Sequence, residues 1–304
     1  MSKATDSYTI RQVVDLTGLS EFTLRGWENR YEAFRPNRTA TGRRMYSQSD
    51  LQKAILLREL LLRDHRIGEI ADLSVAALRD LLEDESGESP QAPGPYKAQR
   101  ENIFRHLSLQ NWNELKDELR RATRKDKPLA VLADLIAPLV QELGQLVAAG
   151  IVSISQEHIF SALLKERLYV LSESARKGNK NARFVVAAPE GDFHELGILI
   201  AHAMLAHSGF PSLYLGPNTP KKDLGETIHR FGATHVLLGS TVSRKEGAKE
   251  DLYTFLHFLD RHLSRETSIW LGGRNAANPF GEVQRSVVRF SSLGQFEKAL
   301  RYVE

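Results

Sequence analysis

The sequence has 304 residues and no cysteine, and its 41 Lys and Arg against 38 Asp and Glu give a net charge of +3. This length allows two or three domains with buried cores, and 41% hydrophobic with 26% charged residues is typical of globular chains. The lack of cysteine excludes disulfides, thiolate zinc sites, iron–sulfur clusters and a cysteine nucleophile. Because the chain contains no apolar run of about 18 residues and starts with polar residues, we expect a cytoplasmic protein without a membrane partner.

The N-terminal region is predicted to be a winged helix-turn-helix domain, which we place at residues 1–75. A short first helix is expected to end at Gly18, and Ser20 is expected to cap a second helix over 21–31. The following segment 35–47 contains proline, glycine and alternating residues, which indicates a β-hairpin or wing. Two helices joined by a tight turn and followed by a wing are typical of proteins that bind the major groove of DNA.

Arginine is concentrated between Phe22 and Tyr46, where six arginines and two glutamates give 6 − 2 = +4, more than the +3 of the whole chain. Guanidinium groups bind phosphates and guanine edges well, because their donors are planar and paired. The cluster therefore predicts DNA binding, with a solvated arginine-rich surface as the alternative. The candidate DNA-binding residues are Thr23, Arg25, Asn29, Arg30, Arg38, Arg43, Arg44 and Tyr46. Trp27 and Tyr31 are expected in the core of this domain rather than against bases.

The order of residues over 8–73 resembles the MerR family of transcription regulators. The similar stretch reads YTIRQVVDLTGLSEFTLRGWENRYEAFRPNRTATGRRMYSQSDL, with the helix-turn-helix, R-W-E-R-Y, P-x-R-T, G-R-R-x-Y-S and D-L motifs in order. The resemblance implies a winged DNA-binding domain that acts as a dimer on near-palindromic sites. Many members of this family sense metals through cysteine, and since this chain has none, another signal is expected.

The rest of the chain is predicted to contain a linker, a helical domain and an α/β domain. An acidic stretch rich in Ser, Pro and Gly over 83–95 indicates the linker, which we place at 76–97. Four helical patterns without strands predict a four-helix bundle over 98–178. Strands that alternate with helices then predict a flavodoxin-like, doubly wound parallel sheet over 182–304. The expected strands cover residues 184–188, 212–215, 235–238, 269–271 and 287–290.

A histidine lies in the loop PEGDFHELG that follows the first of these strands. Ligands of open parallel sheets bind at the carboxyl ends of the strands. The imidazole of His194 is a good ligand for cobalt or another borderline metal, and Asp192 can hold its other ring nitrogen. Gly197 leaves room for the close approach of backbone or ligand. A capping or structural histidine is the alternative.

Hydroxyl and glycine residues at two later strand ends suit a long nucleotide-like tail of a ligand that enters the sheet. These residues include Ser240, Gly272 and Gly273. The constellation resembles the cobalamin-binding domain shared with methionine synthase and with CarH/LitR-type photoreceptor regulators. The resemblance implies that His194 is the lower axial ligand of cobalt, that Asp192 supports the imidazole, and that Gly197 belongs to the same motif. It also implies cofactor contacts at Ser240, Val242, Gly272 and Gly273.

The same resemblance implies that Glu157 and His158, on a bundle helix, lie over the upper face of cobalamin, with an ordinary surface pair as the alternative. Light-sensing members have a Trp ten residues before that Glu and a His directly after the Trp. Here these positions are Val147 and Ala148, which cannot shield an adenosyl group or bind cobalt. We keep Val147 as a cofactor contact, leave the form of the cobalamin open and do not expect adenosyl-dependent light switching.

Catalysis is not expected, because the substrate barrel of cobalamin enzymes needs about 250 residues and the three domains leave no room for it. The predicted function is a DNA-binding repressor whose oligomerisation or operator binding is controlled by cobalamin bound between the helical bundle and the α/β domain. Its predicted partners are double-stranded DNA, further copies of the chain in a dimer or tetramer, and a protein antirepressor. The alternative is a cofactor-independent MerR-type regulator that uses the cobalamin-type fold for oligomerisation or protein docking.

Overall fold

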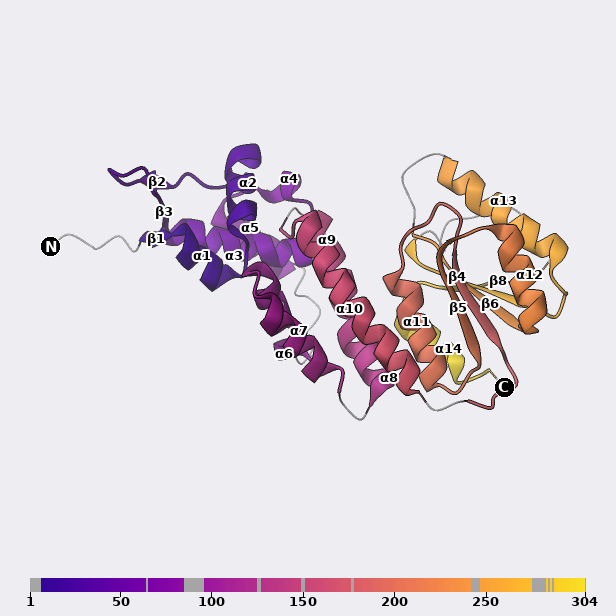
Figure 1. Ribbon diagram of the computed structural model, residues 1–304. Coiled ribbons are helices and arrows are strands. Elements are labelled where there is room, and N and C mark those ends of the chain that lie inside the picture. Colours follow the sequence, from indigo (N-terminus) through magenta and orange to yellow (C-terminus); the bar gives the residue numbers. More distant parts are fainter. Residues whose placement is uncertain are drawn as a thin grey trace. The chain divides into compact units, whose positions relative to one another are not determined.

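The computed structural model describes residues 7–63, 65–84, 96–124, 127–148, 151–175, 178–241, 247–274, 283, 285 and 287–303 (Figure 1). The chain forms two compact units. Unit 1 comprises Met1–Ala122 and Leu139–Leu163, and unit 2 comprises Thr123–Pro138 and Leu164–Glu304. The helices predicted over 98–178 are therefore divided between the two units.

The first part of unit 1 combines a three-stranded antiparallel sheet with helices. Its elements are β1 (Ser7–Thr9), α1 (Ile10–Thr17), α2 (Glu21–Tyr31), β2 (Asn37–Arg38), β3 (Arg44–Ser47), α3 (Gln48–Leu62), α4 (Ile67–Ile70) and α5 (Val75–Asp84). Strand β3 lies between β1 and β2. This arrangement confirms the predicted helix-turn-helix and hairpin, whereas β1 was not predicted. Helix α5 occupies the start of the segment 76–97 predicted as a linker, and residues 85–95 of that segment lie outside the described residues.

Local sequence signals set the ends of the first two helices. The side chains of Thr9 and Gln12 form a capping box at the start of α1, each accepting a hydrogen bond from the main-chain N–H of the other. Gly18 ends α1 with φ +70°, a left-handed conformation that glycine adopts without the clash of a Cβ. Ser20 then caps α2 as predicted, and its hydroxyl accepts from the N–H of Thr23 at 3.0 Å.

The helical segment that follows has the predicted helices. They are α6 (Lys97–Ser108), α7 (Trp112–Ala122), a continuous run of α8 (Pro128–Ala130), the π-helical stretch η2 (Val131–Ile136) and α9 (Ala137–Ala148), and α10 (Ile154–Ser174). Within the residues that the structure describes, one helix, Pro128–Val147, is long and apolar enough to cross a membrane. Its Leu132, Leu135 and Leu139 are fully buried, as in a helix that forms part of a protein core.

Unit 2 contains a parallel sheet in the strand order β5-β4-β6-β7-β8. Its elements are β4 (Phe184–Pro189), α11 (Leu196–His207), β5 (Ser212–Thr219), α12 (Lys221–Phe231), β6 (His235–Gly239), α13 (Gly247–His262), β7 (Ser268–Gly272), β8 (Val287–Phe290) and α14 (Leu293–Leu300). The predicted flavodoxin-like, doubly wound fold is confirmed. Because β5 and β6 flank β4 on opposite sides, the loop after β4 lies at the topological switch point, where such sheets bind ligands.

Helices cover both faces of this sheet (Figure 1). Helices α12 and α13 pack on one face, where Leu256 joins Val185 in a buried cluster. Helices α11 and α14 cover the other face, where the ring of Trp270 lies between those of Phe184 and Phe296. Burial on both sides explains why β4 reads as a continuous apolar run without alternation.

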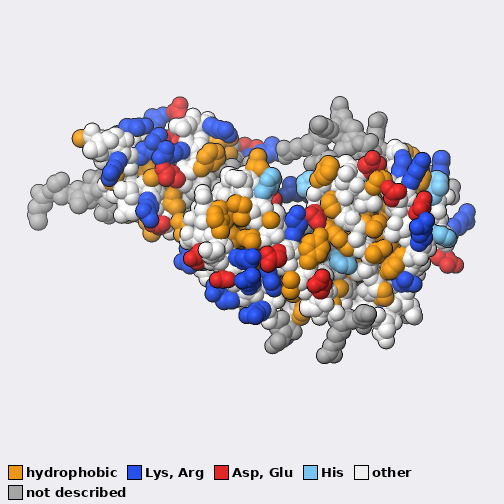
Figure 2. All heavy atoms as spheres, in the orientation of Figure 1, with side chains coloured by type: hydrophobic (Ala, Val, Ile, Leu, Met, Phe, Trp, Pro, Cys, Tyr) orange, Lys and Arg blue, Asp and Glu red, His pale blue; other side chains and the backbone are white. Residues whose placement is uncertain are grey.

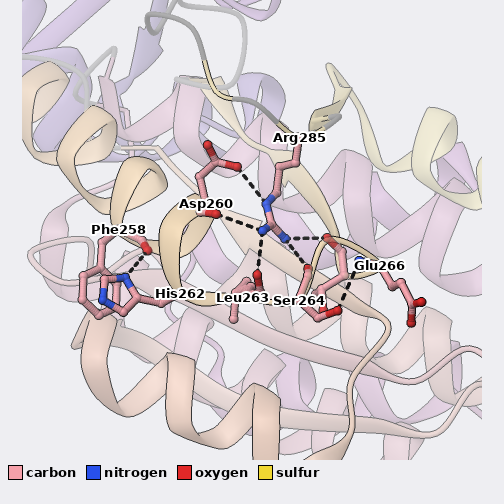
Figure 3. A network of polar contacts seen from close by, with 8 residues as sticks. Phe258, Asp260, His262, Leu263, Ser264, Glu266 and Arg285 are labelled. Atoms are coloured by element: carbon pink, nitrogen blue, oxygen red, sulfur yellow. Dashed lines mark hydrogen bonds and ion pairs between the residues drawn. The ribbon is translucent and has the colours of Figure 1, made fainter.

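A buried arginine closes the carboxyl end of α13 (Figure 3). The Nε of Arg285 donates to Oδ1 of Asp260 at 3.0 Å, and the two side chains are only 7% and 9% exposed. The remaining guanidinium hydrogens reach the main-chain carbonyls of Asp260, Leu263, Ser264 and Thr267 at 2.8–3.1 Å. The cation thereby joins the last turn of α13 to the segment that leads to β7, at a helix carboxyl end where positive charge is favourable.

Candidate functional site

The basic surface of unit 1 is carried by α2 and the β2–β3 hairpin. The predicted DNA-binding residues that are exposed there are Arg25, Asn29, Arg30, Arg38 and Arg43. Figure 2 shows Lys and Arg side chains gathered over this N-terminal part of the chain. Arg25 pairs with Glu21 one helical turn away, and both side chains are about half exposed. An exposed ion pair is worth little in water, so Arg25 can exchange the carboxylate for a DNA phosphate at small cost.

The hairpin turn presents two of these arginines at its tip. The N–H of Thr39 donates to the carbonyl of Arg43 at 2.9 Å, and the N–H of Gly42 donates to the carbonyl of Thr39 at 2.8 Å. Gly42 has φ +79°, which closes the turn. The turn thus carries Arg38 and Arg43 on a short exposed wing.

Arg44 and Tyr46 occupy a different environment from the one predicted. The Nε of Arg44 lies 2.8 Å from Oε2 of Glu28, their side chains are 20% and 14% exposed, and this bond raises the pKa of the guanidinium. The hydroxyl of the fully buried Tyr46 donates to the same carboxylate at 3.3 Å, and burial raises its pKa. Both side chains tie β3 to α2. Burial overturns the predicted DNA contact of Tyr46, and that of Arg44, which is partly exposed, stays a prediction.

Thr23 also points inward. Its side chain is 1% exposed, and its hydroxyl donates to the main-chain carbonyl of Ile151 at 2.7 Å. The hydroxyl of Ser20 reaches the same carbonyl at 3.4 Å. The predicted contact of Thr23 with DNA is therefore corrected, because the first turn of α2 is bonded to the turn between α9 and α10.

The aromatic residues of this domain divide between core and surface. Trp27 is buried as predicted and packs with Phe34, whose ring also contacts Tyr46 edge to face. Tyr31 is 36% exposed, so its predicted place in the core is wrong. As the last residue of α2, Tyr31 lies where the helix leaves the core.

The loop after β4 brings Asp192 and His194 together at the switch point. Asp192 is buried, and its Oδ1 accepts the main-chain N–H of His194 at 3.0 Å and lies 2.8 Å from the Nδ1 of its ring. The other carboxylate oxygen accepts the N–H of Thr241, after β6, at 2.6 Å. The imidazole itself is 61% exposed. Asp192 thus holds the ring through Nδ1 and directs Nε2 as the nitrogen that would meet a ligand.

The glycines around this loop differ in what surrounds them. A Cβ at Gly197 or at Gly272 would meet no heavy atom within 4 Å. Gly273 has φ +101°, and a Cβ there would lie 2.3 Å from the carbonyl oxygen of Ser240. Ser240 is buried, and its N–H donates to the carbonyl of Gly272 at 2.9 Å. The ends of strands β6 and β7 are therefore in close contact, and the space beside Gly197 and Gly272 is open. The predicted cofactor contact Val242 lies outside the described residues.

These features fit a cofactor that brings its own metal ligands. Among the described residues, no group of three or more His, Asp or Glu is placed to hold a bare metal ion. A single exposed imidazole with a carboxylate behind it is suited to be an axial ligand to a metal already held in a macrocycle. Gly197, three residues from His194, is exposed, and the space beside its Cα is open.

A cluster around Glu195 was not singled out from the sequence. The carboxylate of Glu195 lies 3.0 Å from Nζ of Lys165, and it accepts hydrogen bonds from the hydroxyls of Tyr169 at 3.2 Å and Tyr214 at 3.3 Å. Burial is the main cause that raises the pKa of both tyrosines. Within unit 2, the cluster fixes the second half of α10 beside the His194 loop. Only its proximity to His194 could have drawn attention to Glu195.

The predicted contacts on the helical segment belong to unit 1. Val147, near the end of α9, is half-buried. Glu157 is half-buried in the first turn of α10, and its carboxylate accepts the hydroxyl of Ser161 at 2.6 Å. The exposed ring of His158 lies 3.5 Å from the same carboxylate. The cofactor contacts of Val147, Glu157 and His158 stay predictions.

Comparison with known proteins adds two family matches. Residues 8–76 match the MerR HTH family regulatory protein, and residues 103–172 match the B12 binding domain. The chain is 28% identical over 285 residues to the HTH-type transcriptional repressor CarH of Myxococcus xanthus, covering 93% of this chain and 94% of that protein. It is 28% identical over 213 residues to the repressor CarA of the same organism, covering 69% and 68%. The monomethylamine corrinoid protein of Methanosarcina barkeri shows a TM-score of 0.49 at 16% identity, covering 68% of this chain and 97% of that one.

The two family matches lie in the order that the sequence predicts. The first covers the helix-turn-helix and hairpin, and the second covers most of α6 to α10. The similar full-length proteins carry the names of transcriptional repressors, not of enzymes. The chain is therefore a transcription regulator with a MerR helix-turn-helix domain and a B12-binding region, homologous to the repressors CarH and CarA.

Proposed function

We propose that this regulator is a repressor whose binding to operator DNA is controlled by a cobalamin. In this proposal, α2 and the β2–β3 wing read DNA, and the His194 loop of unit 2 binds the cofactor. Cobalamin supplies a cobalt ion whose axial ligands can change, and the protein supplies one of those ligands and the groups that orient it. The observation that carries the proposal is the Asp192–His194 pair at the switch point of the sheet.

Three features support cofactor binding at this loop. The ring of His194 is exposed, while Nδ1 is held 2.8 Å from a buried carboxylate, which fixes the ring orientation. Open space lies beside Gly197 and Gly272. The ends of β6 and β7 approach each other closely at Gly273, and a nucleotide-like tail of the cofactor would lie along them. By resemblance, Val147, Glu157 and His158 would contact the opposite face of the cofactor.

One contact supports a route from the cofactor to the DNA-binding helix. The carbonyl of Ile151 accepts the hydroxyl of Thr23 at 2.7 Å, and Ile151 lies within the region that matches the B12 binding domain. Glu157 lies on α10, six residues after Ile151 in the chain. A shift of the start of α10 on cofactor binding would therefore reach the first turn of α2 directly.

The DNA target is a near-palindromic operator bound by a dimer or by a larger assembly of the chain. One short helix and one wing contact too few base edges for specific recognition, so two copies would span half-sites about one helical turn apart. A protein antirepressor is the further partner of this proposal, and we expect the regulator in the cytoplasm.

The second candidate is a regulator that does not need the cofactor. The observation in its favour is Val147, which stands where light-sensing relatives carry a shielding Trp. In this candidate the cobalamin-type fold serves oligomerisation or protein docking, and His194 is a structural loop residue.

Absorbance spectra of the purified protein with hydroxo-, methyl- and adenosylcobalamin separate the two candidates. We expect the wild type to retain cobalamin on gel filtration with a spectral change from imidazole coordination. His194→Ala should lose that change and bind more weakly, Asp192→Asn should lose less, and His229→Ala, on the exposed side of α12, should behave as the wild type. Failure of every cobalamin form to bind would favour the cofactor-independent candidate.

A further inference from the structure

Asn218, near the end of β5, joins this strand to the loop after β4. Its side-chain Oδ1 accepts the main-chain N–H of Gly191 at 2.8 Å. Its own main-chain N–H donates to the carbonyl oxygen of Asp192 at 2.8 Å. Two hydrogen bonds in opposite directions thus clamp two consecutive residues of the His194 loop, and both come from one residue.

The backbone of Asn218 adopts a conformation that needs such contacts. Its φ is +54°, in the left-handed region that L-residues avoid and that asparagine enters more easily than most. In the described part of the chain, the other non-glycine residues with positive φ are Glu32 and Gln110, which both follow the end of a helix. Asn218 instead lies inside a strand, so its strained conformation has to be maintained by its partners.

The clamp acts on the residue that orients the imidazole. The carboxylate of Asp192 contacts Nδ1 of His194 at 2.8 Å and accepts the N–H of Thr241 at 2.6 Å. The direction of a short Asp side chain depends on the position of its own main chain. A fixed main chain at Gly191 and Asp192 therefore fixes the carboxylate, and the carboxylate fixes the ring.

We propose that Asn218 is a positioning residue for His194, which holds the loop so that the Asp192 carboxylate presents the imidazole to cobalt. This inference rests on the proposed role of His194 as a cobalt ligand. Asn218 does not touch the ring and acts through the main chain of Gly191 and Asp192. The neighbouring Thr219 offers a matched control, because its hydroxyl donates to the carbonyl of Gly216 within the same strand and does not reach the loop.

The first test needs no cofactor and measures amide hydrogen exchange by NMR in the full-length protein. Asn218→Gly keeps the left-handed backbone and removes the acceptor of the Gly191 N–H. We expect exchange at Gly191, His194 and Thr241 to accelerate about tenfold, as for the loss of one hydrogen bond. Asn218→Asp keeps an acceptor oxygen and should rescue protection at all three amides, and Thr219→Val should leave them unchanged. Wild-type exchange at His194 and Thr241 in Asn218→Gly would overturn the proposal.

The second test uses hydroxocobalamin reduced on the protein to cob(II)alamin and observed by EPR. In protein labelled with 15N, the 15N splitting reports the fraction of cobalt bound to histidine, because the benzimidazole base of the cofactor carries 14N. Asn218→Gly should lower this fraction at least twofold, and Asn218→Asp should restore it. Equal splitting in Asn218→Gly and wild type would contradict the role of Asn218. Absence of 15N splitting in the wild type would instead contradict the proposed function, and the exchange measurement would still decide whether Asn218 positions the loop.

Discussion

The hydroxyl of Thr23 donates a hydrogen bond to the main-chain carbonyl oxygen of Ile151, across 2.7 Å and 128 positions of sequence. Thr23→Val keeps the shape of the side chain and removes the donor. We expect the free energy of unfolding to fall by about 1–3 kcal/mol, because a buried carbonyl loses a partner. The change in operator affinity on cobalamin binding should become smaller, because the contact links α2 to the B12-binding region.

Titrations of operator DNA with and without hydroxocobalamin measure this coupling. Thr227→Val is the control, since its hydroxyl bonds to Asp223 within its own exposed helix. If Thr23→Val and the wild type respond equally to cobalamin, the contact does not transmit the signal.

Arg43 and Arg44 are neighbours in sequence, but the structure predicts different effects for them. Arg43 is exposed on the wing, so Arg43→Ala should weaken DNA binding evenly across sequences and lower the salt slope by about one unit. Arg44→Ala removes the ion-pair partner of the half-buried Glu28, so this variant, unlike Arg43→Ala, should lower the melting temperature. Fluorescence anisotropy at several salt concentrations, with melting curves of both variants, checks the difference. An unchanged melting temperature in Arg44→Ala would contradict a structural role of the Arg44–Glu28 pair.

Acidification should destabilise unit 2. Burial lowers the pKa of His202 and of His235, so the unfolded chain binds protons more tightly than the folded one. The stability contributed by the neutral rings is present above their unfolded value of about 6.5 and is lost as the pH falls below it. Urea unfolding should therefore have a lower midpoint at about pH 5.5 than at about pH 7.5.

The variant His235→Phe keeps an aromatic ring beside Phe184 and removes one titrating group. It should show a smaller loss of stability between the two pH values, whereas His229→Gln, at an exposed position of α12, should match the wild type. A larger loss in His235→Phe than in the wild type would show that this ring does not titrate as proposed.

Removal of the guanidinium at the end of α13 should strongly destabilise unit 2. Arg285→Ala leaves the carboxylate of Asp260 buried without its cation and removes the guanidinium hydrogen bonds to four main-chain carbonyls. We expect a loss of about 3–5 kcal/mol in the free energy of unfolding, as for breaking a buried ion pair. Arg274→Ala, at an exposed arginine, is the control for a denaturant melt. A loss below about 1 kcal/mol would contradict this prediction, because it would equal the small contribution of an ordinary surface ion pair.

Regular elements of this chain could be predicted from sequence, because the signals are local. Ser20 caps α2 as expected, and the strand at 287–290 has the expected bounds. Strand β5 extends to Thr219, past the predicted end at 215. The prediction stopped early because Gly216 and Pro217 indicate a loop when no pairing partner is known.

The parts that could not be predicted depend on contacts between distant segments. Periodicity places Thr23 on α2 but gives no sign that Ile151 accepts its hydroxyl. The charge count includes Arg44 in the basic surface, whereas its pairing with Glu28 depends on how β3 packs on α2. Asn218 was missed because its role requires the pairing of β4 with β5, although an Asn after Gly and Pro is a signal for a left-handed turn.

The most direct test of the account is the affinity of the full-length protein for operator DNA, selected from a random pool, with and without hydroxocobalamin. We predict that cobalamin changes the wild-type dissociation constant at least fivefold, within the range of ordinary allosteric coupling. The change should be absent in His194→Ala and equal in darkness and light, because Val147 and Ala148 replace the residues of light-sensing relatives. A wild type that binds cobalamin but keeps the same operator affinity would contradict the account.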